Sequence, residues 1–129
     1  MSQKLIIPVA KALYLCDGAI GLANQKTDMV GLFNSIRPEH YPHLHPQFVA
    51  FAQLSGGRGQ IPFYFDVRFA ATDQLVHTTT ARLLNFARRD QVVQLSYTLP
   101  GCRFTQPGVY LVELFCNGQC VADVKVDLL

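Results

Sequence analysis

The clearest pattern in the sequence is a strict alternation of apolar and polar side chains. Between residues 63 and 69 the apolar side chains fall on odd positions, with Tyr64, Asp66 and Arg68 between them. Residues 93–99 alternate in the same way. Because successive side chains of a strand point to opposite faces of a sheet, both segments are predicted to be strands with one face in a core.

Other segments rich in β-branched and aromatic residues predict further strands. They cover residues 9–16, 29–36, 48–54 and 75–84. In the last of these, Leu75, His77, Thr79, Ala81 and Leu83 would share one face. Glycine and proline separate the segments roughly every ten residues, a spacing typical of sandwiches and barrels. No segment has a helical stripe and no linker divides the chain. The sequence therefore predicts a single domain over residues 1–129, an all-β antiparallel β-sandwich of the immunoglobulin-like or a related Greek-key type, with little or no helix.

Asn117-Gly118 predicts a hairpin turn between the last two apolar segments. If these two residues alone formed the loop, Leu114 would lie opposite Val121. If the loop were Cys116–Gly118, with Gly118 in a left-handed bulge, Leu114 would lie opposite Cys120 and the apolar side chains would gather on one face. We predict the second arrangement. Its apolar face would consist of Tyr110, Val112, Leu114, Cys120, Ala122, Val124 and Val126.

Just upstream, Pro107-Gly108 forms a turn that leads into a strand beginning Val109-Tyr110. In immunoglobulin-like sandwiches a tyrosine at such a corner donates a hydrogen bond to the backbone a few residues earlier. This predicts that Tyr110 stabilises the crossover between the two sheets.

Three further features are informative together: the segments 13–18 and 29–36, the prolines around His43 to Pro46, and the closing segment from Pro107 to Tyr110. In these features the sequence resembles a family of small uncharacterised bacterial β-sandwich proteins. It covers nearly the whole chain. Because the family has no established activity, the resemblance implies a β-sandwich fold and no particular function.

Composition narrows the class of protein. Of 129 residues, 50% are hydrophobic and 16% charged, where a typical domain has about 25% charged. This excludes intrinsic disorder. A net charge of +2 argues against a nucleic-acid partner, and no apolar segment is long enough to span a membrane. Pro8 and Lys11 interrupt the apolar N-terminal segment, so we expect no signal peptide, four mostly reduced cysteines and a cytoplasmic protein.

The candidate metal ligands are His40, His43 and His45. Flanking prolines favour an extended chain, in which His43 and His45 point the same way, and zinc takes three or four such ligands. The alternative is a solvated surface loop. The carboxylates are scattered without the pairing that general acid–base catalysis needs, and no nucleophile or phosphate motif is present. We therefore predict no catalytic residue, no cofactor and no enzyme activity.

Two predicted strands are apolar on both faces, although a sandwich buries only one face of each sheet. The second faces carry Val49, Phe51, Val109, Leu111 and Phe115. Exposed apolar patches usually mark an interface. The leading hypothesis is a non-catalytic β-sandwich module that self-associates or docks on a protein partner through one apolar sheet face. The alternative is a small-ligand or metal-binding protein that uses the His40 to His45 loop.

Overall fold

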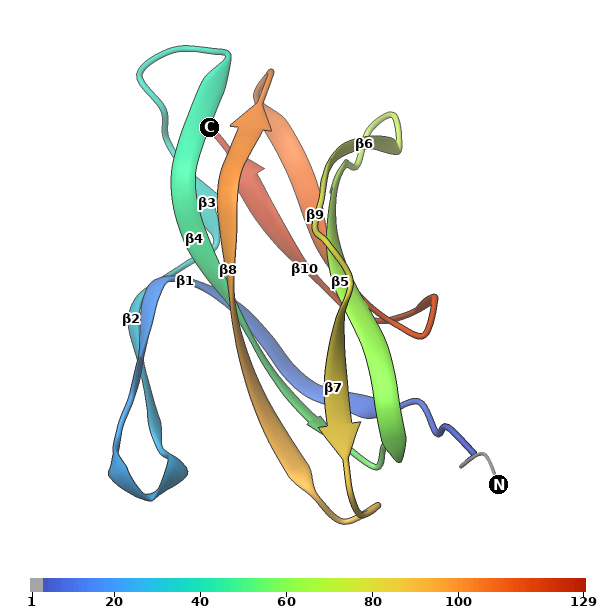
Figure 1. Cartoon of the computed structure of the whole chain (residues 1–129). Helices are drawn as coiled ribbons and strands as arrows, with labels where there is room; N and C mark the ends of the chain where they lie inside the picture. The colour runs from blue at the N-terminus through green and yellow to red at the C-terminus, as the bar shows by residue number, and fades with distance from the viewer. Residues whose placement is uncertain (1–3) are drawn as a thin grey trace.

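A computed structural model describes residues 4–129 as a sandwich of two β-sheets (Figure 1). The first sheet is antiparallel and has the order β2-β1-β4-β8, with β1 at Val9–Gly21, β2 at Thr27–Phe33, β4 at His43–Ser55 and β8 at Val92–Phe104. The second has the order β3-β10-β9-β5, with β3 at Ser35–Ile36, β10 at Gln119–Leu128, β9 at Gly108–Cys116 and β5 at Gly59–Phe69. The far edge of β5 pairs with two short strands, β6 at Gln74–Thr78 and β7 at Arg82–Phe86.

The predicted all-β sandwich is confirmed. One 3-10 turn, Ala23–Gln25, is the only helical element in the described part of the chain. Residues 1–3 of the predicted domain lie outside the described residues. Within residues 4–129 no helix has the length and apolar character needed to cross a membrane.

Six of the strands lie in the order found in immunoglobulin-like sandwiches, although no described strand pairs with the outer edge of β8 in the place of strand D. β1, β4 and β8 occupy the places of strands A, B and E in one sheet, and β5, β9 and β10 those of C, F and G in the other. One detail of the prediction is wrong, because the second sheet is mixed and not purely antiparallel. The chain crosses between sheets after β2, and the short strand β3 then runs parallel to the end of β10.

The core lies between the two sheets and follows the alternation. Phe63, Phe65, Val67 and Phe69 of β5 are all buried in it. β8 contributes Leu99, with Val93, Leu95 and Tyr97 packed against the same cluster. Both strands inferred from this pattern are confirmed, and their polar positions lie on the outer faces.

The predicted loop of the C-terminal hairpin is wrong, although the predicted core face is almost right. Asn117 and Gly118 alone form the loop, and both have positive φ angles, of 50° and 79°, as a type I′ turn requires. The extra residue lies in β10, where the register shifts between Cys120 and Ala122, so that Leu114 lies opposite Ala122. Cys120 is therefore exposed on the outer face. The other six predicted members do face the core: Tyr110, Val112, Leu114, Ala122, Val124 and Val126.

The predicted strand over residues 75–84 is also corrected, because it divides into β6 and β7. Between them, the backbone N–H of Thr79 donates to the Phe65 carbonyl at 2.9 Å. The Thr79 hydroxyl, in place of its carbonyl, accepts from the Phe65 N–H at 2.9 Å. Beyond the interruption, the side chains point to the faces opposite to those expected from an unbroken strand. Leu84 is therefore in the core and 7% exposed, whereas Leu83 is 63% exposed.

Tyr110 forms the predicted tyrosine corner. Its side chain is fully buried, and its hydroxyl donates to the Gln106 carbonyl at 2.8 Å. The same hydroxyl accepts from the Gln106 N–H at 3.4 Å. These bonds connect the start of β9 to the loop by which the chain leaves β8 for the other sheet.

Candidate interaction surfaces

The five predicted interface residues do not form one surface. Val49 and Phe51 belong to β4 in the first sheet, whereas Val109, Leu111 and Phe115 belong to β9 in the second. Both sets lie outside the core cluster, on opposite outer faces of the sandwich. The prediction of a single face is therefore wrong, because alternation shows which side chains share a face of one strand, not which strands share a sheet. Val49 and Phe51 are also only 6% and 8% exposed.

Five of the fourteen exposed large apolar side chains in the described part of the chain lie on a hairpin that sequence reasoning missed. β1 pairs with β4 only as far as Cys16, and from Leu15 to Gly21 it pairs with β2. Beyond Cys16, β2 is thus the only strand that pairs with β1. Figure 1 shows this two-stranded ribbon leaving the body of the sandwich at the lower left. We call residues 17–33 the arm. Its root is held by Phe33, whose ring packs edge-on against that of Phe48 at 6.1 Å.

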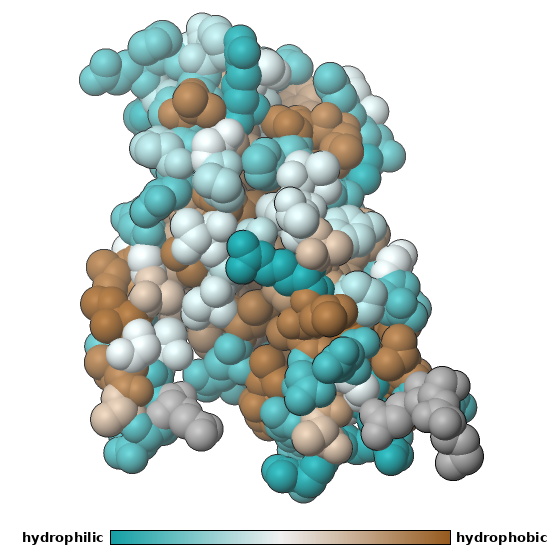
Figure 2. Space-filling view, viewed as in Figure 1, coloured by the Kyte–Doolittle hydropathy of each residue, from teal (hydrophilic) through white to brown (hydrophobic). Residues whose placement is uncertain are grey.

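The arm exposes apolar side chains on both of its faces. Its exposed members are Ile20 at 53%, Leu22 at 45%, Met29 at 39%, Val30 at 48% and Leu32 at 59%. Met29 and Val30 are neighbours in one strand, so they point to opposite faces. Figure 2 shows hydrophobic side chains along the outer margin of the arm. A lone two-stranded hairpin is at best marginally stable in water, so an arm of this composition gains stability from any strand or surface that covers it.

A side-chain hydrogen bond connects the tip of the arm to the first sheet. The Thr27 hydroxyl donates to the side-chain carbonyl of Gln94 in β8 at 3.3 Å. Beside this contact lies an open groove of about 530 Å³, lined mainly by the arm's tip and by Val92 and Gln94. A second, more apolar cavity of about 380 Å³ lies at the root, where Leu13 and Phe33 face Val124 of the other sheet. The arm thus stands away from the body, with hollows at its tip and at its root.

The sequence did contain a signal for the arm. Asn24, Lys26 and Asp28 form a polar group between the apolar segments that end at Leu22 and begin at Met29. Two apolar segments joined by a short polar loop are typical of a hairpin.

Of the three predicted metal ligands, the structure brings two together. The Nε2 atom of His43 and the Nδ1 atom of His45 are 3.2 Å apart and form a hydrogen bond. His40 is exposed in the preceding loop. Within residues 4–129 no three His, Cys, Asp or Glu side chains are grouped so as to hold a metal ion. The pair by itself therefore falls short of the three or four ligands that zinc takes.

His45 is partly buried at the root of the arm. Its ring lies 6.3 Å from that of Phe33 and 5.9 Å from that of Phe48. Burial lowers the pKa of His45, the nearby His43 lowers it further, and Asp17 acts in the opposite direction. This environment favours the neutral imidazole, which can either donate or accept the hydrogen bond to His43.

All four cysteines are unpaired, and three of them are buried. Burial raises the pKa of Cys102 to about 12. Burial, with a smaller contribution from Cys120, raises the pKa of Cys116 to about 11. Cys16 is fully buried, and its thiol donates to the Val49 carbonyl. Reactive thiols usually have a lowered pKa, whereas burial raises the pKa of Cys102 and Cys116.

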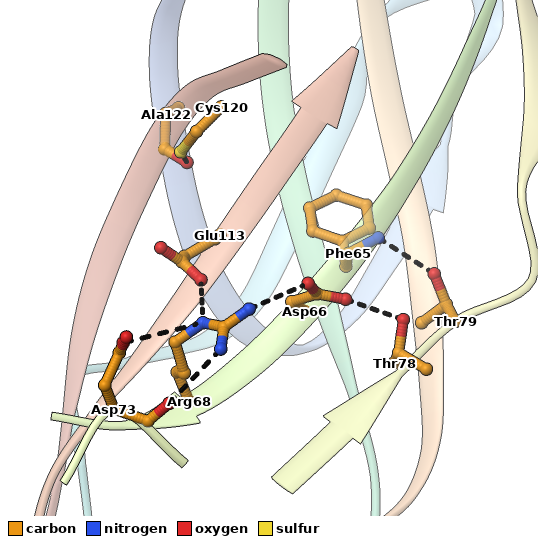
Figure 3. Close-up of polar contacts among 9 residues, drawn as sticks. All are labelled: Phe65, Asp66, Arg68, Asp73, Thr78, Thr79, Glu113, Cys120 and Ala122. Atoms are coloured by element: carbon orange, nitrogen blue, oxygen red, sulfur yellow. Dashed lines mark hydrogen bonds and ion pairs between the residues drawn. The ribbon is translucent and has the colours of Figure 1, made fainter. Parts of the chain in front are cut away.

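The outer face of the second sheet carries a cluster of charges around Arg68 (Figure 3). Arg68 Nε donates to Glu113 Oε1 at 3.0 Å, and Arg68 Nη2 donates to Asp66 Oδ2 at 3.4 Å. Asp66 is only 6% exposed, and its other oxygen accepts from the Thr78 hydroxyl at 2.6 Å. The buried carboxylate of Asp66 is thus both paired with a cation and hydrogen-bonded, as a buried charge requires. These contacts connect β5 to β6 through Thr78 and to β9 through Glu113.

Together these features define a small β-sandwich whose first sheet extends into a projecting apolar arm. The chain belongs to DUF6941, a family of unknown function, whose model matches residues 11–128. The match runs from β1 to the end of β10 and includes the arm. It confirms the resemblance of the sequence to an uncharacterised family. No curated protein matches the chain.

Proposed function

We propose that the protein is a non-catalytic interaction module that binds another protein chain through its arm. The observation that carries this proposal is the exposure of five large apolar side chains on a ribbon with only two strands. Covering one half-exposed side chain of this kind contributes about 1 kcal/mol. The arm of one chain therefore offers about 5 kcal/mol of hydrophobic stabilisation to a complementary surface. A contiguous apolar surface of this kind is typical of an interaction site.

The titratable groups support a non-catalytic role. Burial raises the pKa of the thiols of Cys102 and Cys116, and the one buried carboxylate, Asp66, is engaged by Thr78 and Arg68. We also propose a cytoplasmic location, which the four unpaired cysteines support, because disulfides are rare in reducing compartments.

A photocrosslinking residue placed in the arm tests the proposed function. Position 30 is the test site, and position 109, on the outer face of β9, is the control; the valines there are 48% and 37% exposed. In cells that produce the chain, we expect a discrete crosslinked product from position 30 and none from position 109. The product should disappear when Leu32→Lys is added. Absence of a product from position 30, or an equal product from both positions, would contradict the proposed function.

A second candidate function is metal or small-ligand binding at the histidine pair. The observation in its favour is the 3.2 Å separation of the His43 and His45 ring nitrogens. Metal analysis of the purified protein and thermal shifts with added zinc test it. A zinc-dependent rise in melting temperature that is lost in His45→Gln would support this function, and the lack of any shift would exclude it for zinc.

A further inference from the structure

The free edges of the two sheets differ in how well they are protected. An exposed sheet edge offers unpaired N–H and C=O groups to any other strand, and proteins usually block such edges with short strands, bulges, prolines or covering segments. In the first sheet the edge strands are β2 and β8, and in the second they are β3 with β10 on one side and β6 with β7 on the other.

Three of these edges are protected. β8 contains Pro100 and a left-handed Gly101, and it lies against β6 across the seam of the sandwich. The edge of β10 has a bulge after Cys120, is covered at its end by β3 and lies beside β1. The edge formed by β6 and β7 is divided into two strands of five residues each.

The fourth edge, β2, has little of this protection. It contains no proline, its one irregularity is the left-handed Gly31, and it packs mainly against β1. Residues 28–32 are all exposed. An exposed edge and apolar side chains on both faces thus coincide on the same segment.

We propose that a second copy of this chain docks on the arm, by antiparallel pairing of the two β2 edges about a two-fold axis. This proposal rests on the proposed function and identifies the partner. Such pairing would join the two first sheets into one continuous sheet. It would also bring Met29, Val30 and Leu32 of both copies into one contact, because a two-fold contact uses the same surface patch on both copies.

The charges of the arm permit this occupant, and its size limits the strength of the contact. The arm carries one lysine, Lys26, against Asp17 and Asp28, so two arms meet without strong like-charge repulsion. A stable dimer of standard size buries about 800 Å² on each partner. A two-stranded ribbon with five half-exposed apolar side chains, of which three lie in the edge strand β2, offers less than this. The expected dimer is therefore weak, with a dissociation constant in the micromolar range.

Light scattering after size exclusion, over loading concentrations from about 10 to 500 µM, tests the proposal. The wild-type mass should rise toward that of a dimer. Val30→Lys places a charge on the edge and should weaken association by at least about tenfold. Val109→Lys introduces the same change on the outer face of the second sheet and should leave association unchanged. Met29→Lys repeats the test on the opposite face of the arm, and melting temperatures show that each variant folds.

Hydrogen exchange locates the contact. Backbone amides of residues 27–33 should exchange more slowly at high than at low protein concentration in the wild type, but not in Val30→Lys. A wild-type chain that stays monomeric throughout, a dimer that Val109→Lys disrupts equally, or concentration-dependent protection outside the arm would each overturn the proposal. If the purified chain is monomeric while position 30 still crosslinks to a different protein in cells, the self-association fails and the proposed function stands.

Discussion

The side chain of Asp17 lies across the backbone of Gly31 at the root of the arm. Gly31 has a φ of +69°, and a Cβ atom at this position would overlap the Asp17 carboxylate. The left-handed backbone therefore favours glycine here, and any added side chain would also have to displace the exposed Asp17 carboxylate. Asp17 lies just beyond Cys16, the last residue at which β1 still pairs with β4, and Gly31 lies in the strand opposite it.

Gly31→Ala should destabilise the fold by about 2 kcal/mol or more, because it combines left-handed strain with a steric overlap. Urea unfolding measures the change. Gly18→Ala is the matched control in the opposite strand of the arm, where no atom lies within 4 Å of an added Cβ, and it should change stability by less than about 1 kcal/mol. Adding Asp17→Ala to Gly31→Ala should restore part of the loss. Equal effects of the two single variants would contradict this account.

Tyr110→Phe removes the hydroxyl of the tyrosine corner. The Gln106 carbonyl then loses its partner at 2.8 Å, and we expect a loss of about 1–1.5 kcal/mol in the free energy of unfolding. Tyr64→Phe is the control, because the Tyr64 ring stacks on Phe115 at 5.0 Å and phenylalanine retains the stack. A loss in the control as large as that in Tyr110→Phe would show that the corner hydrogen bond is not the cause.

Much of the fold could be predicted because alternation and turn chemistry are local properties. The strands around Phe63 and Val93 and the tyrosine corner at Tyr110 follow from residues within one or two elements. The extra residue of the last hairpin was expected in the loop at Gly118 but lies in the strand after Cys120. The two positions produce nearly the same apolar face, so the apolar pattern does not distinguish them. The interruption at Thr79 was missed because the threonine hydroxyl replaces the backbone carbonyl as hydrogen-bond acceptor there. The β-propensity of threonine is the same whether it continues a strand or interrupts one.

The candidate site depended on sheet assignment, which is not local. Phe51 and Leu111 both face outward as predicted, yet they lie on opposite sides of the sandwich because their strands belong to different sheets. The arm was missed for a related reason. Its strand β1 is continuous through Cys16, and only the loss of pairing with β4 beyond that residue turns it into a two-stranded ribbon.

Phe115→Glu separates the arm from the surface first predicted. Phe115 stacks on Tyr64, and a carboxylate at this position would lose that stack and lie two residues from Glu113, next to the buried Asp66. We expect a loss of about 1–3 kcal/mol in stability and no change in self-association. Urea unfolding and light scattering measure the two effects. Dissociation of the dimer by Phe115→Glu in a folded protein would favour the outer face of β9 over the arm.

Thiol labelling should distinguish the four cysteines. Cys120 is exposed, whereas Cys16, Cys102 and Cys116 are buried. Iodoacetamide should therefore add a single group to the native protein, at Cys120, and react with the other three thiols only in denaturant. Mass spectrometry of the intact chain and of its peptides measures this, and Cys120→Ser should abolish the native reaction. Rapid native labelling of Cys102 would contradict the burial described for it.

The root of the arm should make the stability of the protein sensitive to acid. Because the pKa of His45 is lowered in the folded protein, the unfolded chain binds more protons once the pH falls below about 6.5. Stability should therefore be fully present near pH 7.5 and decline toward pH 5. His45→Gln should flatten this decline. Asp17→Asn should steepen it, because Asp17 raises the pKa of His45 and its neutralisation widens the difference between the two states. Thermal unfolding at several pH values measures all three proteins, and a decline of equal slope in each would exclude His45 as its source.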